Sequence, residues 1–304
     1  MMKAKGNAQP DKLKGLQEQL IKDLQAAGAI CSKPVEEAFL HIPRHRYLRG
    51  MVEPEEAYLD KAVNLKWGIS TSSQPQVIAL MLEALEPFAG MKVLEIGTAS
   101  GYNAALLADI AGPDGLVVTL ELEEDLAMRA AKLLDEDFSF RVEVHVQDGW
   151  KGYQEHAPYD RVIITAEARN ISSGIADQTK DGGIIVVPLK IDQRVTLMVS
   201  LQKDGAKLEG EFFGFPVSFV PMRGKDRPDS PEGLATSDVI YSGLGWRLWR
   251  LSLEEQVGLI LQQKVCGSCE AREIYKQWRQ AGSPGLADYR LTISEGDWTF
   301  TLKE

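Results

Sequence analysis

Residues 93–108, VLEIGTASGYNAALLA, decide the fold that the sequence predicts. They read as a short apolar strand, a turn that carries Gly97 and Gly101, and the start of a helix. Glycines at these points let the backbone approach a ligand closely. Ala99 stands where a dinucleotide fingerprint has its middle glycine, and Glu95 would repel a pyrophosphate. The turn therefore favours a ligand with a cationic end, such as S-adenosyl-L-methionine, over a tight turn that holds no ligand.

Strands and helices alternate on both sides of this stretch. Further strands are expected at 116–120, 142–146, 160–165 and 183–188, and helices at 74–85, 104–110 and 125–134. This alternation predicts an α/β fold with a mostly parallel sheet and helices on both faces. Two later strands, at 194–201 and 212–219, alternate more strongly and can run antiparallel at the edge of the sheet.

Acidic residues end or follow the next two strands at the same expected edge. Glu121 ends the second strand, where a carboxylate can accept hydrogen bonds from both hydroxyls of a ribose. Asp148 follows the third strand, where it can accept from an adenine amino group, and Gly149 leaves space for the ring. Taken alone, Glu121 could equally be an exposed surface residue, and Asp148 could equally belong to an ordinary Asp-Gly turn. Together with the glycine turn, they predict a nucleoside pocket at the carboxyl edge of the sheet.

A run of hydroxyl side chains precedes the helix expected at 74–85. Ser73 and Gln76 have the spacing of a capping box, so Ser73 fits a helix cap. The position also suits a binding role, because a helix N-terminus has free N–H groups and the positive end of the helix dipole. Thr71 and Ser73 would then hold and orient a carboxylate. The sequence leaves both interpretations open.

The composition narrows the classes of partner. Lys and Arg number 34 against 44 Asp and Glu, and the formal net charge of -10 disfavours a protein that grips nucleic-acid phosphates. No apolar run approaches the roughly 18 residues of a membrane span. Three cysteines cannot form a disulfide framework, and the start of the chain lacks the apolar core of a signal peptide. We therefore expect a cytoplasmic protein without nucleic-acid or membrane partners.

Five stretches resemble, in order, the protein-L-isoaspartate O-methyltransferase family: AYLDKAVNLKWGISTSSQP, VLEIGTASGYNAALLA, VVTLELEEDL, VQDGWKGYQEHAPYDRVIIT and QTKDGGIIVVPL. The resemblance covers roughly residues 43–189. It implies a Rossmann-like methyltransferase fold with a mostly parallel seven-strand sheet and S-adenosyl-L-methionine as the methyl donor. It also implies methylation of the α-carboxyl of L-isoaspartyl residues in damaged proteins, whose ester collapses to a succinimide that reopens partly to normal aspartate.

The resemblance also implies roles for particular residues. Ser73 matches the family's active-site serine, and Thr71 matches the threonine that precedes it. The candidate cofactor-binding residues are Glu95, Gly97, Thr98, Ser100, Gly101, Glu121, Leu122, Asp148 and Gly149. No metal is implied. The expected partners are protein or peptide substrates with isoaspartyl or aspartyl residues.

The sequence departs from the family pattern in three places. The usual Gly-Gln before the threonine is replaced by WGIS at 67–70, Ala99 stands where glycine is common, and the chain continues beyond Gly224. The SSQP variant and the stretch FVPMRG are similar to relatives that methylate a chosen aspartate in ribosomally made peptides. A dedicated peptide-tailoring methyltransferase is therefore one alternative, and a non-catalytic S-adenosylmethionine-binding module is another. An RNA methyltransferase is disfavoured by the net charge and by the lack of an Asn/Asp-Pro-Pro-Tyr type motif.

Composition shifts divide the chain into four expected parts. Residues 1–60 would be a helical segment packed on the catalytic domain, and 61–222 the S-adenosylmethionine-binding methyltransferase domain. A charged linker rich in proline and glycine follows at 223–233. Residues 234–304, with helices near 253–263 and 271–278 and a strand near 291–301, would form a small α+β domain. Such a linker predicts a separable domain.

Cys266 and Cys269 form a lone C-x-x-C motif. A zinc site would need two more ligands, and a redox motif would sit at the start of a helix in its own βαβ unit. Structural or incidental cysteines are therefore favoured.

Overall fold

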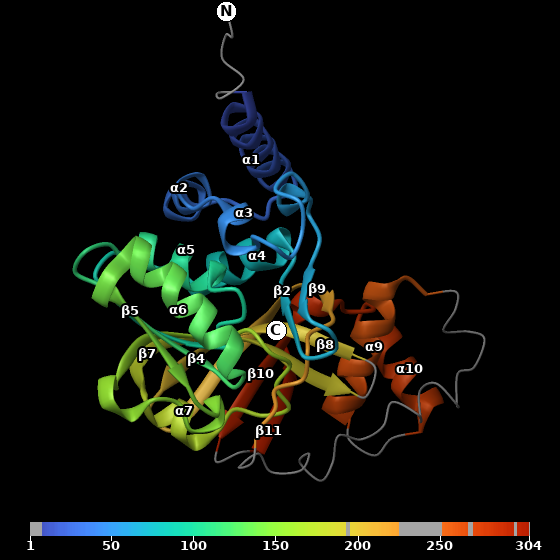
Figure 1. Ribbon diagram of the computed structural model, residues 1–304. Coiled ribbons are helices and arrows are strands. Elements are labelled where there is room, and N and C mark those ends of the chain that lie inside the picture. Colours follow the sequence, from blue (N-terminus) through green and yellow to red (C-terminus); the bar gives the residue numbers. More distant parts are fainter. Residues whose placement is uncertain (1–7, 193–194, 225–250, 267–269, 295–296, 304) are drawn as a thin grey trace, which may run out of the picture.

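The computed structural model describes residues 8–192, 195–224, 251–266, 270–294 and 297–303. Its centre is a mixed sheet whose strands lie in the order β11-β10-β9-β8-β7-β6-β3-β4-β5 (Figure 1). The order reverses beside β3, because the chain runs outward to β4 and β5 and then returns to β6 on the other side. Such a switch point is where α/β sheets bind ligands, just beyond the carboxyl ends of the strands.

Five strands of this sheet are parallel, as the alternation of strands and helices predicts. They are β3 (Lys92–Ile96), β4 (Leu116–Glu121), β5 (Val142–Val146), β6 (Tyr159–Ile164) and β7 (Thr179–Asp192). Most of their apolar residues are buried on both faces, which is typical of a parallel sheet covered by helices.

The remaining four strands run antiparallel: β8 (Val195–Asp204), β9 (Lys207–Val217), β10 (Tyr289–Ser294) and β11 (Asp297–Leu302). The seven strands from β3 to β9 match the seven-strand sheet that the resemblance implies. The last two extend it to nine within the described residues. The single strand expected at 291–301 is instead this pair, β10 and β11, which lie side by side.

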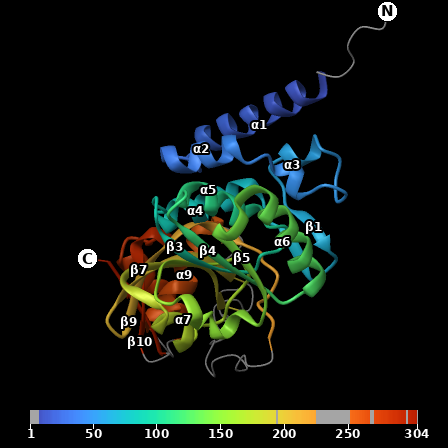
Figure 2. The ribbon, with the colours of Figure 1, turned by 60° about the vertical axis from the view of Figure 1, so that its left-hand side comes forward.

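Helices cover both faces of the sheet (Figures 1 and 2). On one face, α4 (Pro75–Leu85), α5 (Tyr102–Ala111) and α6 (Glu124–Phe138) lie on the sheet. The helices α1 (Ala8–Ala26) and α2 (Lys33–His41) form an outer layer over α4 and α5 (Figure 2). The other face carries α7 (Ser173–Asp177), α9 (Leu253–Cys266) and α10 (Ala271–Gln280). The described helices include none with the length and apolar character needed to cross a membrane.

Short elements connect these layers. A two-stranded hairpin of β1 (Val63–Lys66) and β2 (Ser70–Ser72) stands apart from the main sheet, and α3 (Arg44–Tyr47) precedes it. Single 3-10 turns lie at Glu56–Tyr58, Ser139–Arg141, Gly149–Lys151, Gln154–His156 and Leu286–Asp288. The sequence did not predict the hairpin.

The described part of the C-terminal region does not stand apart as its linker suggested. Strand β10 hydrogen-bonds along β9, from Arg290 opposite Glu211 to Ser294 opposite Lys207. Helices α9 and α10 bury their apolar side chains in the same hydrophobic cluster as the central strands. We infer that this region belongs to the same folding unit. The expected linker lies outside the described residues beyond position 224.

Candidate active site

An open cavity lies at the switch point of the sheet. Its lining comes from the carboxyl ends of β3, β4 and β6, from the hairpin β1–β2 and from residues 220–223 after β9. Of the cofactor-binding residues predicted from the sequence, this lining includes Gly97, Glu121, Leu122 and Gly149. The position agrees with the nucleoside pocket that the strand ends predict.

Two glycines keep this cavity clear. Gly97 has φ 104°, and a Cβ there would overlap the hydroxyl of Thr165. A Cβ on Gly149 would overlap the side chain of Ile96. Gly101 also has a positive φ, of 82°, but it lies at the start of α5, where a Cβ would press on α6. Gly97 and Gly149 therefore shape the cavity, whereas Gly101 lines no described cavity and serves the packing of two helices.

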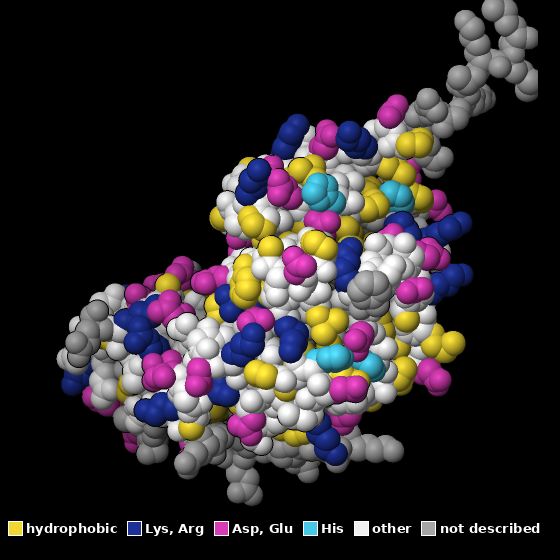
Figure 3. Space-filling view, turned by 90° about the vertical axis from the view of Figure 1, so that its left-hand side faces the viewer, with side chains coloured by type: hydrophobic (Ala, Val, Ile, Leu, Met, Phe, Trp, Pro, Cys, Tyr) yellow, Lys and Arg dark blue, Asp and Glu magenta, His cyan; other side chains and the backbone are white. Residues whose placement is uncertain are grey.

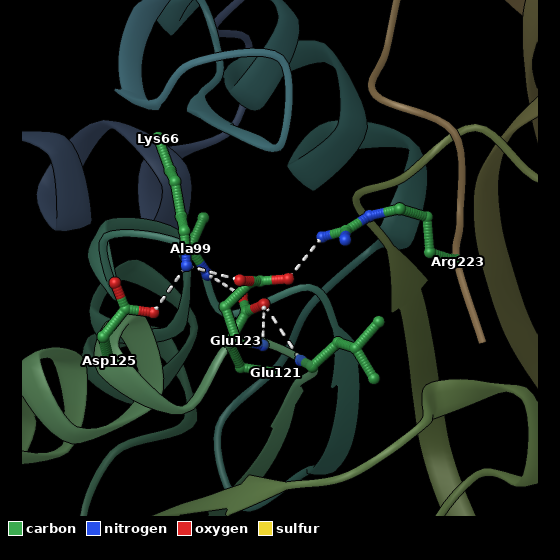
Figure 4. A network of polar contacts seen from close by, with 7 residues as sticks. Lys66, Ala99, Glu121, Glu123, Asp125 and Arg223 are labelled. Atoms are coloured by element: carbon green, nitrogen blue, oxygen red, sulfur yellow. Dashed lines mark hydrogen bonds and ion pairs between the residues drawn. The ribbon is translucent and has the colours of Figure 1, made fainter. Parts of the chain in front are cut away.

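Glu121 lies at the tip of β4, and its carboxylate is held by three backbone N–H groups (Figure 4). Ala99 N donates to Oε2 at 2.8 Å, and Leu122 N and Glu123 N donate to Oε1 at 2.9 and 3.0 Å. The side chain is 7% exposed. A carboxylate has about four acceptor positions, so Oε2 keeps capacity for a further donor. These bonds also fix the turn that follows β3 against the end of β4.

Asp148 caps the 3-10 turn that follows β5, because its Oδ1 accepts from Trp150 N at 3.0 Å. It does not contribute to the cavity lining, whereas its neighbours Gln147 and Gly149 do. Gly224 covers the carboxylate so closely that a Cβ there would overlap it. The interaction with an adenine amino group thus stays a prediction, and Gln147 is a lining residue that sequence reasoning missed.

Glu95 lies behind the cavity wall, where it is fully buried. Along β3, Ile96 faces the cavity, and the alternation of side chains turns Glu95 to the opposite face of the sheet. There it accepts hydrogen bonds from Thr119 Oγ1 at 2.5 Å and Asn103 Nδ2 at 2.7 Å. Burial raises the pKa of its carboxyl group to about 7, against the opposing effect of these hydrogen bonds. The structure therefore does not bring Glu95 onto the ligand surface.

A second, smaller cavity adjoins the first. The two share Thr71, Gly97, Ala99 and Thr165. The smaller cavity is rich in hydroxyl groups, and its polar side chains include Thr71, Ser72, Ser73, Thr98, Ser100 and Asn103. Both residues that the resemblance marks as catalytic are therefore on its wall, together with three of the predicted cofactor residues, Gly97, Thr98 and Ser100. Asn103 and Ser72 were not predicted.

Ser73 is not the cap of α4. The cap position is Gln74, and it makes no side-chain cap hydrogen bond. Asp60 takes that role from a distant part of the chain, because its carboxylate accepts from Gln76 N and from Gln74 Nε2, both at 2.8 Å. The capping-box interpretation is therefore wrong, since a carboxylate from another segment already satisfies the helix start. Ser73 is part of the lining of the smaller cavity, and its hydroxyl makes no hydrogen bond with the described residues.

Three charged residues bridge the walls of the larger cavity (Figure 4). Glu123, just after β4, pairs with Lys66 of the hairpin at 2.5 Å and with Arg223 at 2.9 Å. Lys66 also contacts Asp125 at 3.0 Å. These ion pairs tie the hairpin and residues 220–223 to the edge of the sheet. Sequence reasoning missed them, because nothing local to any one of these residues indicates its partners.

Cys266 is not part of the lining of either cavity. Cys266 ends α9, and its thiol donates to Gln277 Oε1 at 2.8 Å. Cys269 lies outside the described residues. Among the residues that the structure describes, no group of three or more His, Cys, Asp or Glu side chains could hold a metal ion.

Comparisons with known proteins show which family the chain belongs to. The protein-L-isoaspartate(D-aspartate) O-methyltransferase family model matches residues 15–227. A protein-L-isoaspartate O-methyltransferase of Pyrobaculum islandicum is 39% identical over 209 residues, which cover 67% of this chain and 97% of that protein. The enzyme of the same name from Methanopyrus kandleri is 37% identical, with 74% of this chain and 99% of that protein covered.

Solved structures show the same fold. A protein-L-isoaspartate O-methyltransferase structure matches with a TM-score of 0.68 and 22% identity, over 95% of this chain and all of that one. A Plasmodium falciparum protein described by the same activity, in complex with S-adenosyl-L-homocysteine, matches with a TM-score of 0.59 and 19% identity over 68% of this chain and 98% of that one. The family match and the curated relatives together show that this chain belongs to the protein-L-isoaspartate(D-aspartate) O-methyltransferase family.

Proposed function

We propose that this chain is a protein-L-isoaspartate O-methyltransferase, which transfers a methyl group from S-adenosyl-L-methionine to the α-carboxyl of isoaspartyl residues in proteins. One observation carries the proposal: a cavity with a carboxylate at a strand tip adjoins a cavity lined by hydroxyl groups. Ligands bound in the two would meet at the shared wall, near Thr71 and Ala99. Holding two reactants in contact is the main requirement of a group transfer.

The larger cavity fits the methyl donor. Glu121 would accept from the ribose hydroxyls with the remaining capacity of its carboxylate. Gly97 and Gly149 leave space for the donor, and Leu122 and Gln147 form further parts of the cavity wall. When bound, S-adenosyl-L-methionine supplies a methyl group on a positively charged sulfur. The protein's part is to bind the donor and to keep the reactive end at the wall shared with the smaller cavity.

The smaller cavity suits a carboxylate acceptor. A carboxylate is already ionised at neutral pH, so the reaction needs no strong general base. The hydroxyls of Thr71 and Ser73 can donate to its oxygens and set their direction of approach. Burying the acceptor and donor charges where water is scarce favours a reaction in which those charges neutralise each other. We assign Thr98 and Ser100 to this wall as well.

A polypeptide substrate suits the surroundings of this site. Trp67 projects from the tip of the hairpin with 85% of its side chain exposed, next to residues that line the larger cavity. Such a side chain can contact residues that flank the acceptor carboxylate. Figure 3 shows Lys and Arg side chains intermingled with Asp and Glu on one face. This mixture and the net charge of -10 both disfavour a nucleic-acid partner. We place the reaction in the cytoplasm, since the sequence holds only three cysteines.

The test is methyl transfer to two peptides that differ only in aspartate or isoaspartate at one position. We expect radiolabelled methyl to enter the isoaspartyl peptide alone. Labelling of the aspartyl peptide instead would favour the peptide-tailoring alternative, and donor binding without transfer to either would favour the non-catalytic module. The expected product is a labile ester, because the neighbouring amide nitrogen can attack it and expel methanol. Label that stays on the peptide after brief alkaline treatment would rule out carboxyl methylation.

A further inference from the structure

Arg44 is a buried arginine whose position the cavities alone do not explain. It begins α3 and is only 1% exposed. Its guanidinium forms no ion pair with a described carboxylate, and its Nε has no hydrogen-bond partner. Burial lowers its pKa, yet an arginine stays charged in a protein. A buried cation is costly unless many acceptors surround it, so this placement calls for a reason.

The acceptors are four main-chain carbonyls from two segments that meet beside the smaller cavity. Nη1 donates to Ala57 O at 2.8 Å and to Leu59 O at 3.4 Å. Nη2 donates to Lys61 O at 3.2 Å and to Ser73 O at 3.0 Å. One guanidinium thus joins residues 57–61 to the main chain of Ser73. Only the planar fork of arginine can reach several carbonyls in this way, because a lysine ammonium is a compact point donor.

The hydrogen bonds of Arg44 also hold the start of α4, the helix that begins beside Ser73. Residues 57–61 include Asp60, whose carboxylate closes the start of α4. The end of α4 nearest the cavity is therefore occupied by an anion and cannot itself attract the acceptor. Ser73 is held through its main-chain carbonyl, which accepts a hydrogen bond from the side chain of Arg44.

We propose that Arg44 is the positioning residue of the acceptor site: it fixes the main chain of Ser73 and, through residues 57–61, the start of α4, so that the Ser73 hydroxyl points at the substrate carboxylate. This rests on the proposed function. Arg44 is not on the lining of either described cavity, so it acts through Ser73 rather than on the substrate. Replacement of Arg44 should therefore leave the affinity for the methyl donor unchanged.

Arg129 supplies a matched control. It is only partly buried, but like Arg44 it donates to main-chain carbonyls, to Tyr47 O at 3.3 Å and Arg49 O at 2.8 Å, and it has one buried nitrogen without a partner. It ties the end of α3 to α6 and makes no hydrogen bond or ion pair with Ser73. Loss of stability alone should therefore affect Arg44→Lys and Arg129→Lys in similar ways.

The experiment compares the full-length wild type with Arg44→Lys and Arg129→Lys. It measures kcat and KM for an isoaspartyl peptide at saturating donor, donor Kd by calorimetry, and urea unfolding, which gives the folded fraction. We expect Arg44→Lys to lower kcat/KM by on the order of 100-fold, the effect of a small misplacement of reacting groups. Its donor Kd should stay within about twofold, and Arg129→Lys should keep kcat/KM within about threefold of the wild type per folded molecule.

Equal losses of kcat/KM in the two variants, or an intact kcat/KM in Arg44→Lys, would overturn the positioning role. So would a donor Kd weakened in step with activity. If Arg44→Lys does not fold, Arg44→Gln takes its place and the same comparisons apply. A wild type that binds donor but transfers no methyl to the isoaspartyl peptide would refute the proposed function, and with it the acceptor that Arg44 is inferred to position.

Discussion

Ser73 allows a direct test of binding against structure, because its hydroxyl lines the smaller cavity without any hydrogen bond to a described residue. Asp60 already satisfies the start of α4, so Ser73→Ala removes no cap. We expect kcat to fall by about 10- to 100-fold, the effect of losing one hydrogen bond to a charged group. The free energy of unfolding should change by less than about 0.5 kcal/mol. Steady-state kinetics and urea unfolding measure the two effects, and a loss of about 1 kcal/mol with normal turnover would restore the capping role.

Glu121 makes the same kind of prediction for the methyl donor. Its carboxylate ends β4 on the lining of the larger cavity and accepts from three backbone N–H groups. We expect Glu121→Ala to weaken donor binding by on the order of 1.5–3 kcal/mol, because hydrogen bonds to a charged group are lost. Calorimetry on the folded variant measures the change. Glu124→Ala, at an exposed neighbouring position, is the control, and unchanged affinity in Glu121→Ala would contradict the ribose assignment.

Glu95 predicts a pH dependence of stability. Burial raises the pKa of its carboxyl group from 4.5 to about 7, so the folded protein holds this proton more tightly than the unfolded chain. The group's contribution to stability is therefore complete below pH 4.5 and is lost as pH rises through 7. Glu95→Gln can still bond Asn103 and Thr119 but cannot ionise.

The wild type should lose stability relative to Glu95→Gln as the pH rises. We expect the difference in free energy of unfolding between the two proteins to change by on the order of 3 kcal/mol between pH 4.5 and 8, in favour of Glu95→Gln. Urea unfolding of both proteins at several pH values measures this difference. The contributions of the other titrating groups cancel, because both proteins contain them. Parallel curves for the two proteins would show that Glu95 is already ionised within the fold.

At the scale of elements, the hairpin β1–β2 and residues 220–223 form two walls of the larger cavity, and Glu123 links them through Lys66 and Arg223. Because exposed ion pairs are weakened by salt, this link should make release of the donor depend on ionic strength. We expect Glu123→Gln to speed donor dissociation by a few-fold at low salt and to reduce its salt dependence. Stopped-flow measurement of dissociation at several salt concentrations checks this, with Glu124→Gln as the control.

If Glu123→Gln and the wild type release the donor at equal rates at every salt concentration, the ion pairs do not control access to the cavity. The proposed site would be unaffected by that result, because Glu121 and the glycines belong to a different part of the lining.

The elements that could be predicted are those whose signal is local. The strand at residues 93–96, its glycine turn and the acidic tip at Glu121 follow from apolar runs and special backbone positions, and the structure has each of them. The cap that Asp60 gives to α4 could not be predicted, because its partners lie 14 and 16 positions further along the chain. The burial of Glu95 is a related case: its residue type suggests a ligand, whereas the side-chain alternation of β3 decides which face it takes.

At the scale of the whole molecule, the described residues after position 250 pair and pack with the sheet, although a linker-like composition precedes them. A proline- and glycine-rich stretch shows where the backbone leaves regular structure, but not whether the chain returns to the same sheet. Here β9 offers a full edge of N–H and C=O groups, and β10 pairs with it. A chain ended near residue 229 would leave that edge unpaired and uncover the apolar cluster beneath α9 and α10.

This arrangement predicts that the described regions unfold together. Trp278 of α10 is fully buried in the same cluster as Ile185 of β7, and its Nε1 donates to Pro284 O at 3.0 Å. Trp278→Ala should cost about 3–5 kcal/mol, a large share of a typical domain's stability. If the chain is one folding unit, urea unfolding followed by far-UV circular dichroism and by donor binding should move to lower urea together. Met128→Ala, at a position 66% exposed, should leave both signals in place. A variant in which circular dichroism shows an early partial transition, while donor binding keeps its wild-type midpoint, would mean that residues 251–303 unfold alone as a separate domain.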